Sequence, residues 1–227
     1  MHRKSIPHTI VASLLCLALI LPLSLYPITA EAAGQTVYVY QDIMVDTTCH
    51  TGNTYVICEV PGTNPQRGPK VMPGVTLTIE SGATVALDSN REYIGGGIDT
   101  HTHGILYVHG NINATGAIFT ARTDKWQYLV LEANDTANLT VNATFTDCIF
   151  EKGGYTEPAG MIMVKENVSL EPSDGQTVNL TIDGCTFRDS FDNQTYGIKG
   201  MGIYSSLGHH TNARGTFSFT DSTFTDL

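Results

Sequence analysis

The sequence predicts an all-β fold built as a solenoid. The first observation is composition: 41% of the 227 residues are hydrophobic and 15% are charged, enough to bury a core and too apolar for a disordered chain. The second is residue type, because 22 glycines, 30 threonines and 12 asparagines suit strands and tight turns better than helices. The third is a motif that recurs at a constant spacing.

The repeated motif has a period of 37 residues, and its copies are Phe145–Phe150, Ile182–Phe187 and Phe219–Phe224. Apolar residues occupy every second position up to a one-residue slip, for example at Asp183-Gly184. A slip of this kind reverses the facing of a straight strand, so the chain must bend there for both halves to point into one core. We therefore expect a coil with corners, in which the phenylalanines that end the three copies stack.

A further apolar strand precedes each copy of the motif. These strands are expected at Tyr128–Leu131, Met161–Val164 and Gly202–Tyr204. Because each repeat supplies strands on several sides and no helical period follows residue 32, the repeats predict a solenoid in which each turn pairs only with its neighbours. The alternative is a β-sandwich, whose strands alternate similarly but have no need to repeat a bend at constant spacing.

The first 32 residues have the order of a secretory signal peptide. A basic start, Met1–Lys4, precedes a nearly unbroken apolar run, Ile10–Tyr26, and small residues close the segment at Ala30-Glu-Ala32. We expect cleavage after Ala32, which predicts an exported protein, secreted or at the extracellular cell surface, with no membrane span in the mature segment. The alternative is an uncleaved signal anchor, because the apolar run is nearly long enough to span a bilayer.

The charge balance excludes one class of partner. With 22 acidic and 12 basic residues the formal net charge is −10, which is the wrong sign for binding nucleic acid or anionic lipid through phosphate groups. For an exported module with an exterior rich in threonine and asparagine we instead expect surface polysaccharide or neighbouring surface proteins as partners.

Four cysteines follow the signal segment, and export permits disulfides. Cys49 and Cys58 flank Gly52-Asn53, which would turn the chain into a small hairpin, so we expect a Cys49–Cys58 disulfide. Cys148 and Cys185 occupy equivalent places on consecutive coils, where side chains stack in parallel rather than pointing at each other. We expect these two to be buried free thiols, with a bridge between them as the alternative.

The residues upstream of the repeated motif carry a resemblance. The segments Lys70–Leu87, Gly104–Gly116, Ile118–Ala121 and the strand led by Trp126 resemble the opening coils of secreted right-handed parallel β-helix repeat surface proteins with a pectate-lyase-like fold. The resemblance implies a right-handed parallel β-helix over residues 70–227. It implies little about activity, because such β-helices occur in adhesins, surface-layer components and carbohydrate-active enzymes alike.

The two ends of this β-helix lead to separate expectations. Residues 33–69 match no part of the resemblance, and we expect them to form an N-terminal cap or a first coil. The third copy of the motif finishes at Phe224, close to the final Leu227, and no cap follows it. We therefore expect the coils of residues 70–227 to be truncated at the C-terminus.

Asn-x-Ser/Thr sequences are more frequent than the composition predicts. The excess indicates a glycosylated exterior, although an outward strand face rich in threonine generates the same sequences by itself. The candidate glycosylation sites are Asn113, Asn134, Asn138, Asn142, Asn167, Asn179 and Asn193.

One segment has the spacing of a metal site. Gly97–Gly104 contains Asp-Thr-His-Thr-His and resembles the first metal-binding strand of the amidohydrolases, which would make His101 and His103 ligands. Those enzymes need a (β/α)8 barrel with further ligands, whereas no helix is predicted here. We therefore expect a solvated turn between two coil strands, with no metal and no cofactor.

No catalytic residue is nominated from the sequence. The recurring acids Asp147, Asp183 and Asp221 lie at the predicted bend, where turn geometry explains an aspartate better than acid-base chemistry does. We expect an exported structural or adhesive β-helix module. The alternative is a carbohydrate-active enzyme, a polysaccharide lyase or hydrolase. Convergent carboxylates beside an aromatic platform would favour the enzyme, and an outward face of threonine and asparagine would favour the module.

Overall fold

The computed structural model describes residues 34–94, 100–133, 140–154, 160–165, 176–190, 192–193, 198–199, 201–206 and 214–225. These residues form a parallel β-solenoid of about four turns with three parallel sheets, which confirms the predicted fold class. The right-handed sense of the coil stays a prediction. The predicted signal segment, residues 1–32, lies outside the described residues. No helix in the described part of the chain is long and apolar enough to span a bilayer.

The solenoid strands belong to three sheets, each given in its spatial order. The seven-stranded sheet contains β1 (Thr36–Val39), β3 (Thr54–Ile57), β6 (Thr84–Leu87), β11 (Ile118–Ala121), β14 (Ile149–Glu151), β17 (Thr186–Arg188) and β22 (Thr223–Phe224). The six-stranded sheet contains β2 (Thr47–Cys49), β5 (Thr76–Ile79), β10 (Asn111–Thr115), β13 (Thr140–Thr146), β16 (Thr177–Asp183) and β21 (Arg214–Thr220). The five-stranded sheet contains β20 (Met201–Ser206), β15 (Gly160–Lys165), β12 (Tyr128–Glu132), β9 (Ile105–Val108) and β4 (Lys70–Val71).

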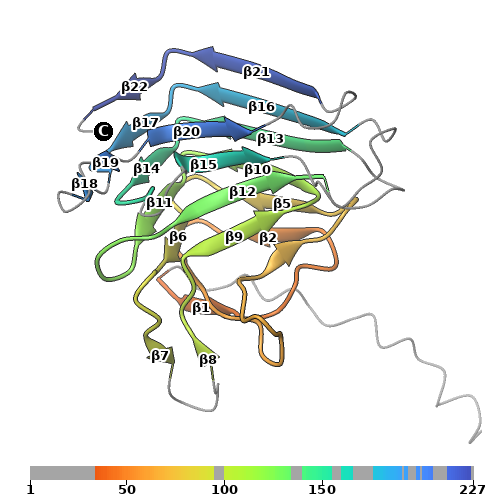
Figure 1. Cartoon of the computed structure of the whole chain (residues 1–227), viewed down its shortest axis with the longest axis vertical. Coiled ribbons are helices and arrows are strands. Elements are labelled where there is room, and N and C mark those ends of the chain that lie inside the picture. Colours follow the sequence, from red (N-terminus) through yellow and green to blue (C-terminus); the bar gives the residue numbers. More distant parts are fainter. Residues whose placement is uncertain are drawn as a thin grey trace, which may run out of the picture. The chain divides into compact units, whose positions relative to one another are not determined.

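Each turn visits the six-, seven- and five-stranded sheets in that order, so β10, β11 and β12 form one turn and β13, β14 and β15 the next (Figure 1). Two short antiparallel pairs interrupt this route: β7 (Tyr93–Ile94) with β8 (Thr100–His101), and β18 (Asp192–Asn193) with β19 (Ile198–Lys199). The segment from β1 to β3 is paired in the same sheets as the later strands, so it is part of the coil.

The register of the strands follows the repeat. Strand β13 pairs residue for residue with β16, and β16 with β21, so Phe145 lies beside Ile182 and Ile182 beside Phe219. In the five-stranded sheet, Leu129 pairs with Ile162, and Ile162 with Ile203. The motif strands and the three upstream strands expected from the sequence are thereby confirmed.

The predicted bend lies between the six-stranded and the seven-stranded sheet. The backbone is left-handed in six successive copies of this corner, and the N–H of each of the first five donates to a carbonyl of the following copy at 2.8–3.2 Å. Glycine adopts this conformation without strain and aspartate tolerates it better than most residues. The corner residues are Gly52 (φ 77°), Gly82 (80°), Gly116 (56°), Asp147 (53°), Gly184 (63°) and Asp221 (47°).

A column of phenylalanine rings runs through the core beside the seven-stranded sheet. Phe119, Phe150, Phe187 and Phe224 stack with ring centroids 4.6, 4.7 and 4.8 Å apart and planes within 7° of parallel. The ring separation follows the spacing of neighbouring strands. The predicted stack is confirmed, and Phe119 extends it by one turn.

The predicted Cys49–Cys58 disulfide is not formed, because both residues are free thiols that lie on opposite faces of β3 and its sheet. Cys49 packs in the main core together with Tyr55 and Ile57, whereas Cys58 belongs to a second apolar cluster with Val56. The alternation of inward and outward side chains along β3 and beyond therefore directs Cys58 away from the core. Burial raises the pKa of Cys58 to about 11.

Cys148 and Cys185 are buried free thiols on consecutive turns, as the parallel stacking of their strands predicts. The Cys148 N–H donates to Cys185 Sγ at 3.3 Å. The hydrogen bond with Cys185, together with burial, raises the pKa of the Cys148 thiol, so this group stays protonated.

The segment around β8 is not the solvated turn that the sequence suggests. Thr100 and Thr102 are buried. The Glu59 N–H donates to the His101 carbonyl, and Cys58 forms an antiparallel β-bridge with Thr102, so this segment is paired with the chain that follows β3. The β7–β8 hairpin contributes Ile94 to the second apolar cluster, on the outer side of the seven-stranded sheet.

Candidate functional site

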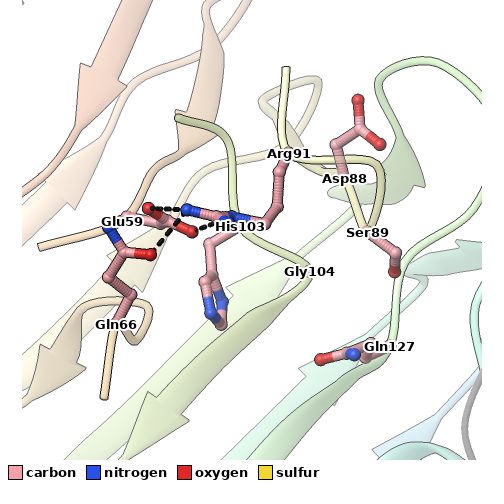
Figure 2. Close-up of a pocket in the computed structure, with 8 residues that line it drawn as sticks. All are labelled: Glu59, Gln66, Asp88, Ser89, Arg91, His103, Gly104 and Gln127. Carbon is pink, nitrogen blue, oxygen red and sulfur yellow. Dashed lines mark hydrogen bonds and ion pairs between the residues drawn. The ribbon is translucent and has the colours of Figure 1, made fainter. Parts of the chain in front are cut away.

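A polar pocket of about 280 Å³ lies where the coil passes from the seven-stranded to the five-stranded sheet. Three successive turns contribute to it, because their connecting segments meet at this corner. Its lining consists of Glu59 and Gln66 after β3, Asp88, Ser89 and Arg91 after β6, His103 and Gly104 before β9, and Gln127 immediately before β12 (Figure 2).

One side of the pocket is a hydrogen-bonded ion pair. Arg91 donates from Nε and Nη2 to the two oxygens of Glu59 at 2.5 and 3.0 Å, and from Nη2 to Gln66 Oε1 at 2.6 Å (Figure 2). The Glu59 side chain is 4% exposed, so the carboxylate depends on Arg91 for its charge balance. The hydrogen bond with Glu59 raises the pKa of Arg91.

The second carboxylate of the lining, Asp88, is fully buried and satisfied. Its Oδ1 accepts from the Asn90 N–H at 2.9 Å, and its Oδ2 accepts from the Thr123 hydroxyl at 2.8 Å. In Figure 2 the Asp88 carboxylate points away from Glu59 and His103. The two carboxylates therefore do not converge on a common point.

His103 lines the pocket as a neutral imidazole. Burial lowers the pKa of His103, against a weaker raising effect of its hydrogen bond with the Ile105 backbone. Nδ1 lies 3.1 Å from Ile105 N and 3.3 Å from Ile105 O, so the same backbone residue serves either tautomer. The ring is thereby fixed in place.

Two polar side chains of the lining are unused. Ser89 Oγ is buried and has no hydrogen-bond partner, and the Gln127 amide likewise makes no hydrogen bond with the described residues. Gly104 packs closely against both residues: a Cβ there would lie 2.7 Å from Ser89 Oγ and 3.2 Å from Gln127 Cγ, so only glycine fits at this point of the lining. A buried hydroxyl is normally paired, so the unpaired Ser89 Oγ, beside the half-buried Gln127, makes this part of the pocket a candidate for binding a polar ligand.

His101 and His103 do not form a ligand pair. His101 packs edge-on against Tyr93 with ring centroids 5.5 Å apart, and its Nδ1 lies 3.9 Å from Glu59 Oε2. In the described ranges no group of three or more His, Cys, Asp and Glu side chains is placed to hold a metal ion.

The outward face of the six-stranded sheet carries aligned polar side chains. Asn142 Nδ2 donates to Asn111 Oδ1, and Asn179 Nδ2 donates to Asn142 Oδ1, each at 2.9 Å, which makes an asparagine ladder across three turns. The next outward row along these strands consists of Thr78, Asn113, Thr144, Thr181 and Ser218.

Three candidate glycosylation sites lie on this face: Asn113 and Asn142 are exposed, and Asn179 is half-buried. Of the other four, Asn193 lies in β18. Asn134, Asn138 and Asn167 lie outside the described residues. Among the three, Asn113 is the one that takes no part in the ladder.

The outward face of the five-stranded sheet is of a different kind. Tyr107 and Tyr128 are half-buried diagonal neighbours on β9 and β12. Further along, Glu132 Oε2 lies 3.6 Å from His109 Nε2, and Glu132 Oε1 lies 3.3 Å from Lys165 Nζ. The Glu132 carboxylate on this face is thus ion-paired with Lys165.

Of the charged and titratable side chains in the pocket, sequence reasoning considered only His103, as a possible metal ligand, and it set that possibility aside in favour of a solvated turn. Glu59, Arg91 and Gln127 lie in three different connecting segments that share no period. The one signal that could have indicated the pocket is the presence of polar residues in the segments that connect the strands at the corners of the solenoid.

No family model matches the chain, and comparison with curated proteins and with solved structures found no significant match. The function is therefore argued from the geometry of the molecule itself.

Proposed function

We propose that this chain is an exported cell-surface module with a structural and adhesive role and no catalysis of its own. It is a glycosylated β-helix of the right-handed, pectate-lyase-like kind, and it binds surface polysaccharide or neighbouring surface proteins. The secretory order of residues 1–32 supports export, and the seven Asn-x-Ser/Thr sequences support glycosylation.

The outward face of the six-stranded sheet carries this proposal. Its asparagine ladder, Asn111, Asn142 and Asn179, satisfies its own hydrogen bonds from turn to turn and stiffens the coil. The adjoining row of four hydroxyls and the Asn113 amide provides both donors and acceptors at the regular spacing of the strands. A surface of this kind suits adhesion to hydroxyl-rich partners better than acid-base chemistry.

A carbohydrate-active enzyme is the second candidate, because the pocket brings Glu59, Asp88 and His103 near one open space. Two observations disfavour it. Both oxygens of each carboxylate already accept hydrogen bonds, and Asp88 points away from the other two residues (Figure 2). A glycosidase needs two carboxyl groups that face the scissile bond from set distances.

The test is incubation of the exported protein with a panel of acidic and neutral polysaccharides. We expect co-sedimentation with at least one insoluble polysaccharide and no release of reducing ends or unsaturated products. Reproducible turnover that Glu59→Gln or Asp88→Asn abolishes would show an enzyme and contradict the adhesive function.

A further inference from the structure

We infer that the pocket binds one neutral sugar unit, a compact polyhydroxylated ring such as the end of a surface glycan. The inference rests on the proposed adhesive function and deepens it by naming the site and the class of ligand. Four properties of the pocket carry it: its size, its unused polar groups, its charge and its rigidity.

The size suits a single ring. Pockets for drug-sized ligands have volumes of about 300–1,000 Å³. This pocket, at about 280 Å³, lies just below that range. It holds one ring and excludes a branched or extended segment, so the chain to which the ring belongs must remain outside.

The unused polar groups match hydroxyls. Ser89 Oγ both donates and accepts, and the Gln127 amide supplies a donor nitrogen and an acceptor oxygen. Gly104 packs closely against both residues, so no larger residue fits at this point of the lining. Vicinal hydroxyls of a sugar donate and accept in the same way, so they can satisfy both side chains at once.

The charge of the lining disfavours an anion. Arg91 is neutralised by Glu59, and the lowered pKa of His103 leaves its ring uncharged at neutral pH. Asp88 then leaves the lining with one net negative charge. A uronic acid or a phosphate would meet this charge without a free cation to offset it, whereas a neutral ring meets no such penalty.

The pocket is held in shape before a ligand arrives. Arg91 clamps Glu59 and Gln66, Asp88 is fixed by two hydrogen bonds, and the Ile105 backbone holds His103. Binding therefore orders few side chains, which leaves more of the interaction energy as affinity.

The experiment is a titration of the isotopically labelled protein with methyl glycosides of glucose, galactose, mannose and N-acetylglucosamine, followed by amide chemical shifts. The methyl glycoside of glucuronic acid, which keeps its free carboxylate, serves as the anionic probe and is called the glucuronate below. We expect saturable shifts at Gly104 and Gln127 with at least one neutral glycoside, with a dissociation constant on the order of millimolar, and at least threefold weaker binding of the glucuronate.

The variants Gln127→Leu and Ser89→Ala each remove one unused group without enlarging a neighbouring side chain. Each variant is expected to raise the dissociation constant of the neutral glycoside about fivefold to tenfold, which is the usual effect of one lost hydrogen bond. Gln35→Leu and Ser81→Ala change the same residue types at exposed positions and should leave the affinity unchanged. Unaltered amide spectra away from the pocket would show that each variant is folded.

Three outcomes overturn the inference: no saturable shift with any neutral glycoside, equal affinity in Gln127→Leu, or tighter binding of the glucuronate. Failure of the adhesive function looks different. If the Gln127→Leu variant still co-sediments with polysaccharide, the protein is adhesive but this pocket is not the adhesive site. If the protein binds the glycoside and also turns over polysaccharide, the pocket is a sugar site but the adhesive function is wrong.

Discussion

At the scale of single residues, the corner between the six- and seven-stranded sheets explains why aspartate and glycine recur in the repeat. Asp147, Gly184 and Asp221 are equivalent residues of successive turns, and all have positive φ. The left-handed conformation costs an ordinary L-residue roughly 1–2 kcal/mol, and Gly and Asp are the types that adopt it most readily among those available here. The recurrence is thus a property of the backbone, and it gives no indication of acid-base catalysis.

Replacing the corner glycine tests this explanation. Gly184→Ala adds backbone strain and also brings a Cβ against the Asp147 carboxylate. Gly62→Ala is the matched control, because Gly62 also has positive φ but has no heavy atom within 4 Å of an added Cβ. We expect the control to lower the free energy of unfolding by about 1 kcal/mol and Gly184→Ala by about 2 kcal/mol or more. Chemical denaturation measures both, and equal losses would contradict a packed corner.

At the scale of elements, four neighbouring strands of the seven-stranded sheet, β11, β14, β17 and β22, each carry a phenylalanine that stacks on the phenylalanine of the next strand. Phe150 and Phe187 are completely buried in the aromatic column, whereas Phe224, on the edge strand β22, is 45% exposed. A ring in the middle of the column contacts two neighbours, and the ring on the edge strand contacts one described neighbour. Packing energy therefore depends on position within the column.

Truncation of two rings measures that dependence. Phe187→Ala empties a space in the middle of the core and is expected to lower the free energy of unfolding by about 3–5 kcal/mol. Phe224→Ala removes the same atoms from an exposed ring and is expected to cost less than about half as much. The midpoints of urea unfolding give the comparison, and a larger loss for Phe224→Ala would be inconsistent with the observed burial.

At the scale of the whole molecule, several carboxylates link stability to pH. The clearest is Asp42, whose two oxygens accept from Arg67 Nη1 and Nη2 at 2.7 Å. The Lys70 N–H also donates to Asp42 Oδ1, at 2.9 Å. The hydrogen bonds from Arg67 lower the pKa of Asp42 below its usual value, although partial burial acts in the opposite direction. Burial alone would raise the pKa of Glu151, but the hydrogen bonds from Arg188 and Thr120 outweigh it and lower that pKa.

A carboxyl group whose pKa is lowered in the folded state stabilises the protein at any pH above the pKa of the same group in the unfolded chain, which is about 4. This stabilisation is lost as the pH falls through the pKa of the folded state. Asp42→Asn should therefore cost about 1–3 kcal/mol of unfolding free energy at pH 7, and the difference from the parent should shrink below about pH 4. Unfolding curves between pH 3 and 7 measure this. Asp124→Asn, at an exposed carboxylate, is the control; a pH-independent difference for Asp42→Asn would disprove the linkage.

The repeated strands and their register could be predicted because each turn of a solenoid repeats the same pattern of inward and outward residues and pairs with the next copy. The alternation around Phe145–Phe150 and the slip before Cys148 are readable along the chain, and the 37-residue period aligns them. The failed disulfide shows the limit. Cys49 and Cys58 are close in sequence, but the facing of each depends on the register of its own strand, which the spacing between two cysteines does not reveal.

By itself, the amino-acid sequence determined the parallel solenoid, its corner residues and its aromatic column, because these depend on patterns that recur with a period and pair with their own copies. Only the tertiary structure decided the pocket. Glu59, Arg91, His103 and Gln127 come from connecting segments without a common period, and three turns of coil must close before their side chains meet. The scaffold is thus encoded locally and repeatedly, while the candidate binding site exists only through contacts between turns.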